Sequence, residues 1–206
     1  MSVIATDNFN RADQAGLSAS WTTVTGVNTF NIVSNRASTG FDPTANRYSG
    51  ATWPNDQYSQ CAIITPLPLG GGEGCGPAGR IATAATTMYI AIFNSADSEM
   101  YAVVGGSYTQ IGSSGTVATN GQIAYLSMVG TTIVYKLAGT TQASVTDSSI
   151  ASGQAGIFGA ASTNNAIVDD WEGGDFGGGG GGAPLFRQSL LNGIGAGGKF
   201  FNNPLG

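Results

Sequence analysis

The stretch Asn-Ala-Ile-Val-Asp-Asp-Trp-Glu-Gly-Gly-Asp-Phe at residues 165–176 is followed by an unbroken run of glycines at 177–182. Before this stretch, short apolar runs alternate with turn residues. After it, the chain has too few apolar groups, too often interrupted by glycine, to build a core. We therefore predict one domain over residues 1–176 that closes with a strand, a flexible glycine-rich linker over 177–183 and a C-terminal arm over 184–206.

The composition before the glycine run favours strands over helices. Glu, Lys, Arg and Leu are scarce, and Val, Ile and Thr are common. Short runs rich in aromatic and β-branched residues recur at regular spacing with no helical period, which is typical of an antiparallel sandwich or barrel. Two pairs of runs are predicted to form hairpins, 88–93 with 100–104 and 123–129 with 131–137.

Two segments are predicted to lie outside the regular strands. Residues 39–56 carry Pro43, Pro54 and two glycines, and are expected to form a long ordered loop or a broken edge strand. The glycine-rich residues 69–79 are expected to be a connection between two strands.

Two motifs resemble a known family. Asp-Asn-Phe-Asn-Arg-Ala-Asp at 7–13, with Leu17 and Trp21 after it, is similar to the opening of laminin-G-like domains of the concanavalin A-like lectin/glucanase superfamily. Residues 153–172, from Gly-Gln-Ala-Gly-Ile-Phe to Ile-Val-Asp-Asp-Trp-Glu, are similar to its end. The resemblance covers roughly residues 5–176 and implies an all-β, antiparallel jelly-roll sandwich whose last strand lies beside the first. Lectins, hydrolases, adhesins and virion proteins share this fold, so it fixes no function.

Charge and residue types exclude several classes of function. The net charge is −5 and the basic residues are scattered singly, which disfavours nucleic-acid binding. The absence of histidine excludes Ser-His-Asp and Cys-His catalysis and histidine metal sites. The Glu-x-Asp-x-x-Glu triplet of the superfamily's glucanases is missing, and Asp97-Ser98-Glu99, the nearest run, falls in a predicted turn. The chain is therefore not expected to be an enzyme.

The N-terminus has neither a basic region nor a long apolar region, so no signal peptide is predicted. No apolar run is long enough for membrane insertion, and we expect the protein to be made in the cytoplasm. Cys61 and Cys75 are either joined in a disulfide or reduced. Two reduced thiols are favoured because nothing marks secretion.

Two small sites are considered. Tyr48, Trp53 and Tyr58 would suit an aromatic platform for a sugar ring, with core and loop packing as the alternative. Asp7, Asp169 and Asp170 would approach one another if the terminal strands are neighbours, and would then suit calcium. The alternative, that these carboxylates cap turns and decorate a solvated strand, is favoured, so no metal or other cofactor is expected.

The arm is the most informative feature for assembly. Its apolar residues and the proline that opens it are Pro184, Leu185, Phe186, Leu190, Leu191, Ile194, Phe200, Phe201 and Leu205. A short apolar segment on a tether usually docks in a groove of its own domain or of a neighbour. The long glycine tether favours a partner, either another copy of the chain or another virion protein.

Together these features favour a structural, non-enzymatic virion protein of a tailed bacteriophage, such as a capsid decoration protein or a head- or tail-fibre component. The arm would anchor it in an oligomer. The supporting features are the predicted β-sandwich without a signal peptide, the low charge and the apolar tail, and the resemblance adds that such domains occur in phage structural proteins. The alternative is a carbohydrate-binding, lectin-like module in which Tyr48 and Trp53 stack on surface glycans.

Overall fold

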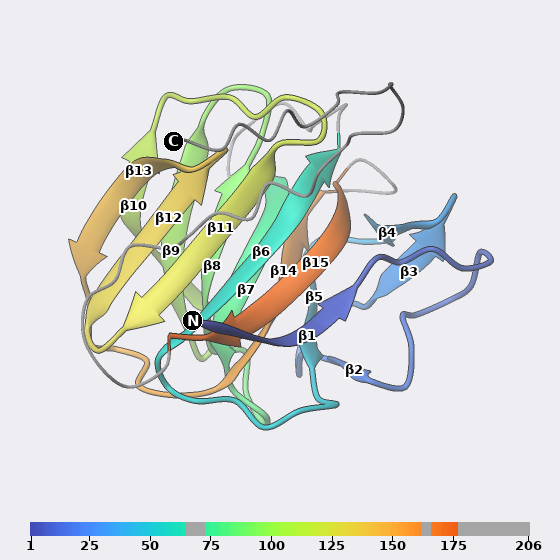
Figure 1. Cartoon of the computed structure of the whole chain (residues 1–206), viewed down its shortest axis with the longest axis horizontal. Helices are drawn as coiled ribbons and strands as arrows, with labels where there is room; N and C mark the ends of the chain where they lie inside the picture. Colours follow the sequence, from blue (N-terminus) through green and yellow to red (C-terminus); the bar gives the residue numbers. More distant parts are fainter. Residues whose placement is uncertain (65–72, 162–165, 177–206) are drawn as a thin grey trace, which may run out of the picture.

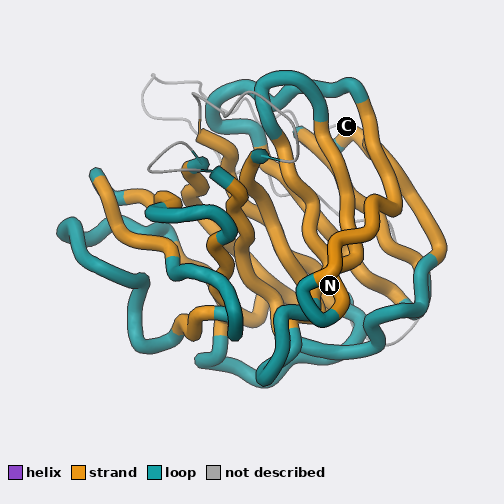
Figure 2. Tube along the Cα trace, turned by 180° about the vertical axis from the view of Figure 1, so that it is seen from behind, coloured by secondary structure: helices purple, strands orange, loops and turns teal. Residues whose placement is uncertain are grey.

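The computed structural model describes residues 1–64, 73–161 and 166–176, which form fifteen strands and no helix (Figure 2). The eight-stranded sheet has the order β13 (Thr140–Thr146), β12 (Thr132–Leu137), β11 (Ile123–Val129), β6 (Gln57–Ile64), β15 (Ile167–Asp175), β4 (Arg36–Thr39) and β3 (Phe30–Val33), with β1 (Ser2–Asp7) also on β15. The seven-stranded sheet has the order β10 (Ser107–Ser114), β9 (Ser98–Val104), β8 (Met88–Phe93), β7 (Gly74–Ile81), β14 (Gln154–Ala160), β5 (Thr44–Tyr48) and β2 (Trp21–Thr23).

The two sheets lie face to face, with the eight-stranded sheet in front in Figure 1. Neighbouring strands are antiparallel, and alternate side chains meet between the sheets, where Leu126 and Ile133 of one sheet and Tyr89 and Phe93 of the other are fully buried. The predicted jelly-roll sandwich is confirmed. Both predicted hairpins form, and β1 pairs with β15, as the resemblance implied.

The central strands of the seven-stranded sheet are buried on both sides. On β8, Tyr89 and Phe93 face the other sheet, whereas Ile90 and Ile92 belong to a second apolar cluster on the far side. The ring of Tyr108 on β10 reaches over this cluster to within 6.2 Å of the ring of Phe158, between ring centres. Burial on both sides explains why β8 is a continuous apolar run in the sequence.

The glycine-rich segment is not simply a connection, which corrects the prediction. From residue 74 it forms β7, a fully buried strand between β8 and β14. Glycine is needed here for close approach, because a Cβ at Gly76 would lie 2.2 Å from the carbonyl oxygen of Ala91. Pro77 pairs with Ile157 of β14 and has no register partner on β8, so its missing N–H costs no bond on that side. Residues 65–72 lie outside the described residues.

The segment 39–56 also differs from its prediction, because residues 44–48 form β5, which lies between β14 and β2 and is not an edge strand. Asn46 of β5 accepts a hydrogen bond from the backbone N–H of Phe30, at 2.8 Å, and so ties the strand to the opposite sheet. The prolines flank this strand and do not interrupt it. Likewise, Ser98 and Glu99 open β9 and do not lie in a turn.

Cys61 and Cys75 are free, and both are buried in the core between the sheets. Burial raises the pKa of the Cys75 thiol to about 12 and also raises the pKa of Cys61. The described residues include no helix with the length and apolar character that a membrane span requires. The linker over 177–183 and the arm residues from Pro184 to Leu205 lie outside the described residues, so the role given to the arm stays a prediction.

The last strand changes partner along one of its edges. Ile167 and Val168 of β15 pair with β4, and from Trp171 onward the same edge pairs with β1. On its other edge β15 pairs with β6, and the register shifts between Asp169 and Glu172, where Asp170 has a φ of 43°. A bulge of this kind bends the strand and re-aims its side chains. The edge of β15 at 169–170 is therefore left between the ends of β4 and β1.

Candidate functional site

A hollow of about 440 Å³ lies where β15 passes from β4 to β1. Its volume falls within the range of roughly 300–1,000 Å³ that is usual for ligand pockets. Its lining is mostly polar and comes from three strands and the residue after β1: Thr6, Asp7, Asn8, Gln60, Asp170, Trp171 and Glu172.

Three of these residues form one row across neighbouring strands. Thr6 pairs with Glu172, and Glu172 pairs with Gln60. Trp171, next to Glu172, points the other way, because its indole N–H donates to Ser59 Oγ at 2.9 Å in the core. Since successive side chains of a strand face opposite sides, the row lies on the outward side of the eight-stranded sheet, away from the other sheet.

The carboxylate of Glu172 is held in place by its neighbours. Its Oε1 accepts hydrogen bonds from the Tyr58 hydroxyl at 2.7 Å and from Gln60 Nε2 at 3.1 Å. Burial and the bond to Glu172 raise the pKa of the Tyr58 hydroxyl well above its usual value, so the hydroxyl stays a donor at neutral pH. Glu172 is therefore a pre-oriented hydrogen-bond acceptor at the hollow.

Asp7 is engaged elsewhere. It accepts two bonds from the guanidinium of Arg11, at 2.9 and 2.8 Å, one from the backbone N–H of Phe9 and one from the indole N–H of Trp21, both at 2.8 Å. Burial alone would raise the pKa of Asp7, but the bonds from Arg11, Phe9 and Trp21 and the charge of Arg11 outweigh burial and lower it. Asp7 thus anchors the end of β1 to the core.

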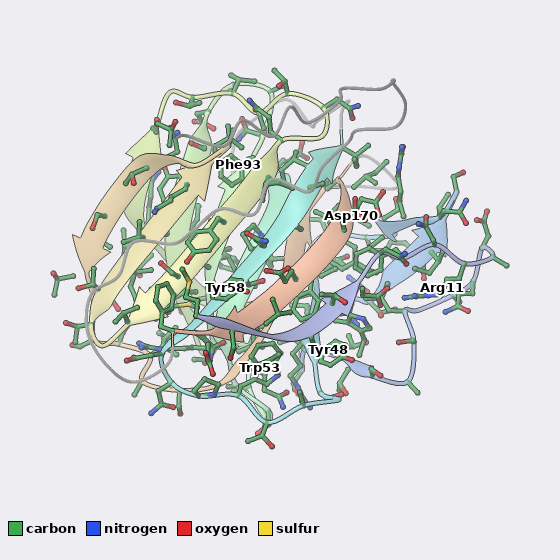
Figure 3. All side chains as sticks on the ribbon, viewed as in Figure 1. Arg11, Tyr48, Trp53, Tyr58, Phe93 and Asp170 are labelled. Atoms are coloured by element: carbon green, nitrogen blue, oxygen red, sulfur yellow. The ribbon has the colours of Figure 1, made fainter. Side chains whose placement is uncertain are left out.

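The other two carboxylates that were considered for calcium also have different partners. Asp169 forms an ion pair with Arg36 at 3.6 Å, and burial raises the pKa of Asp169, with the charge of Asp170 acting in the same direction. Asp170, which is labelled in Figure 3, is exposed and lines the hollow. Within residues 1–64, 73–161 and 166–176, no three acidic or cysteine side chains come together as a metal site, so Asp7, Asp169 and Asp170 do not form one.

The structure brings together two of the three aromatic residues proposed as a sugar platform (Figure 3). The rings of Tyr48 and Trp53 lie 6.4 Å apart, between centres, and both contact Trp171, at 5.2 and 6.1 Å. The indole N–H of Trp53 donates to the Tyr48 carbonyl at 2.8 Å. Tyr48 and Trp53 are therefore half-buried members of an aromatic cluster that also includes Trp21.

Tyr58 belongs to the other side of the sheet. A Cβ at Gly173 would meet Trp53, whereas a Cβ at Gly174 would meet Tyr58, at 2.6 and 2.5 Å. Because adjacent residues of β15 face opposite sides, Trp53 and Tyr58 are separated by the sheet. The three rings therefore do not form one platform.

On the outward side, Tyr58 belongs to a row of residues that the sequence interpretation missed. Its ring stacks on Tyr125 of β11 at 5.6 Å, and the Lys136 ammonium lies 5.7 Å from the Tyr125 ring centre. The row of Thr6, Glu172 and Gln60 runs on through Tyr125 to Lys136. Polar or aromatic residues at alternate positions of these strands were the available signal, but only the register of five strands shows that they share a row.

No family model matches the chain, and no curated protein matches it. Several solved structures resemble it. The carbohydrate-binding module CBM66 from Bacillus subtilis has a TM-score of 0.58 and 18% identity, over 73% of this chain and 91% of that one. The carbohydrate recognition domain of Emp46p has a TM-score of 0.52 and 10% identity, over 82% and 95%.

An enzyme resembles the chain to a similar degree. SCLam, a non-specific endo-β-1,3(4)-glucanase of family GH16, has a TM-score of 0.51 and 11% identity, over 84% of this chain and 88% of the enzyme. Likeness at such low identity shows a shared fold and not a shared activity. With its two antiparallel sheets and its last strand beside the first, this chain is a concanavalin A-like jelly-roll β-sandwich.

Proposed function

We propose that the domain is a carbohydrate-binding module that holds a sugar in the hollow beside β15. The observation that carries this proposal is the row of Thr6, Glu172 and Gln60, which presents a hydroxyl, a carboxylate and an amide on one side of the sheet. Sugar hydroxyls donate and accept hydrogen bonds, and adjacent hydroxyls suit paired carboxylate and amide groups. The exposed carboxylate of Asp170 adds an acceptor at the rim.

The solved structures support this proposal by analogy. Two of those described above are, by name, a carbohydrate-binding module and a carbohydrate recognition domain. The glucanase shares the fold as well, so we propose binding without hydrolysis on the ground that the glucanase triplet is missing from the sequence. A role in a phage virion rests on the arm, and no contact within the described residues favours it over sugar binding.

The test begins with the full-length protein on an array of neutral, amino and uronic oligosaccharides. The best binder is then titrated calorimetrically against Glu172→Gln and Asp170→Asn, with Asp13→Asn as the control. Asp13 is exposed, lies outside the hollow and accepts a bond from the Ser34 N–H that asparagine can keep. Glu172→Gln should weaken binding about tenfold or more, because a hydrogen bond to a charged group is replaced by a weaker one.

Two results would sink the proposal. One is that no oligosaccharide binds, and the other is that Glu172→Gln binds as well as the control variant. The same samples are assayed for release of reducing sugar. Hydrolysis that disappears in Glu172→Gln would replace binding by catalysis as the function of the hollow.

A further inference from the structure

The charge of the chain is divided unevenly between the domain and the arm. All twelve acidic residues precede residue 177, together with five of the seven basic residues, so residues 1–176 carry a net charge of −7. Residues 184–206 contain Arg187 and Lys199 and no acidic residue, which gives them a charge of +2. The arm is therefore apolar and cationic, and its own domain is the acidic surface nearest to it along the chain.

The described chain ends on a defined side of the sandwich. The ring of Phe176 lies edge-on to the ring of Tyr58, with centres 6.2 Å apart, and the Phe176 N–H donates to the Asp56 carbonyl at 3.2 Å. Tyr58 lies on the outward side of the eight-stranded sheet. The chain thus continues into the glycine run from that side.

That side carries an apolar face next to acidic groups. Tyr58 and Tyr125 stack there and are each only 5% exposed, although both lie on the outward side of the sheet. Val134 of β12 follows in the adjoining row, because Tyr58 pairs with Ser127 and Ser127 pairs with Val134. We call Tyr58, Tyr125, Val134 and Phe176 the tyrosine face. Glu172 borders it, bonded to the Tyr58 hydroxyl.

The length of the tether matches this face. A run of six glycines has a root-mean-square span of roughly 13 Å, and neighbouring strands are about 4.8 Å apart, so the tether crosses about three strands. Three steps from β15 lead across β6 and β11 to β12. Six glycines are also few enough to give an effective concentration in the millimolar range, so we prefer docking within one chain to the partner that the sequence interpretation favoured.

We propose that residues 184–206 dock on the tyrosine face of their own chain. In this arrangement the apolar residues in the first half of the arm cover Tyr58, Tyr125 and Val134; they are Leu185, Phe186, Leu190 and Leu191. Arg187, which follows the tether closely, lies on the side of Glu172. The occupant is the arm itself, and this inference does not depend on sugar binding in the hollow.

The chain offers a direct test, because it contains two lysines, Lys136 on the outward side of β12 and Lys199 in the arm. An amine-reactive cross-linker is applied to dilute full-length protein, mixed from isotopically light and heavy preparations, and the products are identified by mass spectrometry. We expect a Lys136–Lys199 cross-link whose two peptides are both light or both heavy. Lys136→Arg, which keeps the charge, should abolish it.

A tethered but undocked arm would also reach Lys136 at times, so a second variant is needed. Leu190→Ser with Leu191→Ser keeps both lysines and the tether but removes apolar contact. If the arm docks, the cross-link yield falls about fivefold or more, because two buried leucines are lost. An unchanged yield, no Lys136–Lys199 product, or products that join light and heavy peptides would each overturn the proposal, and the last would indicate a second copy as the occupant.

Discussion

Replacement of Asp7 by alanine removes the interactions that fix the end of β1. The carboxylate, whose side chain is 9% exposed, accepts four hydrogen bonds, two from Arg11 and one each from Phe9 and Trp21. Hydrogen bonds to a charged group are worth about 1.5–3 kcal/mol each, but they are not additive and the Arg11 end is partly solvated. We expect Asp7→Ala to lower the free energy of unfolding by about 3 kcal/mol, or Tm by about 6–12 °C for a chain of this size.

The loss of stability caused by Asp7→Ala should become smaller as the pH falls. The pKa of Asp7 is lowered in the folded protein from its ordinary value of 3.8, so its stabilising contribution is complete above about pH 3.8 and is lost as pH falls through the lower folded value. The difference between the wild type and Asp7→Ala should therefore be largest at pH 7 and shrink in acid. Urea unfolding at several pH values measures it, with Asp13→Ala as the control. A difference in the free energy of unfolding below about 1 kcal/mol at pH 7, or a difference that does not change with pH, would refute this reasoning.

Three further predictions concern packing. Gly76→Ala should lower the free energy of unfolding by about 3 kcal/mol or more, because the new Cβ would meet the Ala91 carbonyl oxygen. The control Gly115→Ala, with open space around it, should change the free energy of unfolding by less than about 0.5 kcal/mol. Equal losses for the two variants in urea unfolding would contradict the placement of β7. Trp53→Ala should lower the free energy of unfolding by about 2–3 kcal/mol, because contacts in the aromatic cluster are lost, and should leave oligosaccharide affinity unchanged. A loss of affinity without a loss of stability would restore Trp53 as a sugar contact. Cys61 and Cys75 should not react with a thiol reagent at pH 8 in the folded protein, because burial excludes the reagent and raises the pKa of both thiols. Both should react in denaturant. Fast reaction of the folded protein would show that the core opens.

The strands with strong periodicity could be predicted from the sequence, and those that depend on tertiary packing could not. The hairpins of β8 with β9 and β11 with β12 have apolar runs on each side of a polar or glycine turn, so local pattern and structure agree. β7 has glycines and a proline where local rules indicate a loop. Its glycines are needed because β8 approaches at Gly76, and Met128 of the opposite sheet at Gly79, closer than a side chain would allow, which no local pattern reveals.

The candidate site shows the same limit. The run from Asp169 to Glu172 was recognised as the end of the domain, but its function depends on a bulge and on a change of partner from β4 to β1. A one-residue change of register moves a side chain to the opposite side of the sheet. For this reason Trp53 and Tyr58, both plausible sugar contacts by residue type, lie on opposite sides of β15.

The most direct test of the central claim is amide hydrogen exchange of the full-length protein with and without the oligosaccharide that binds best on the array. We predict that the ligand slows exchange at residues 6–8, 60 and 170–172, which line the hollow. Slowed exchange confined to other segments, such as 48–53, with none at the hollow, would contradict the account and place the sugar on a different surface.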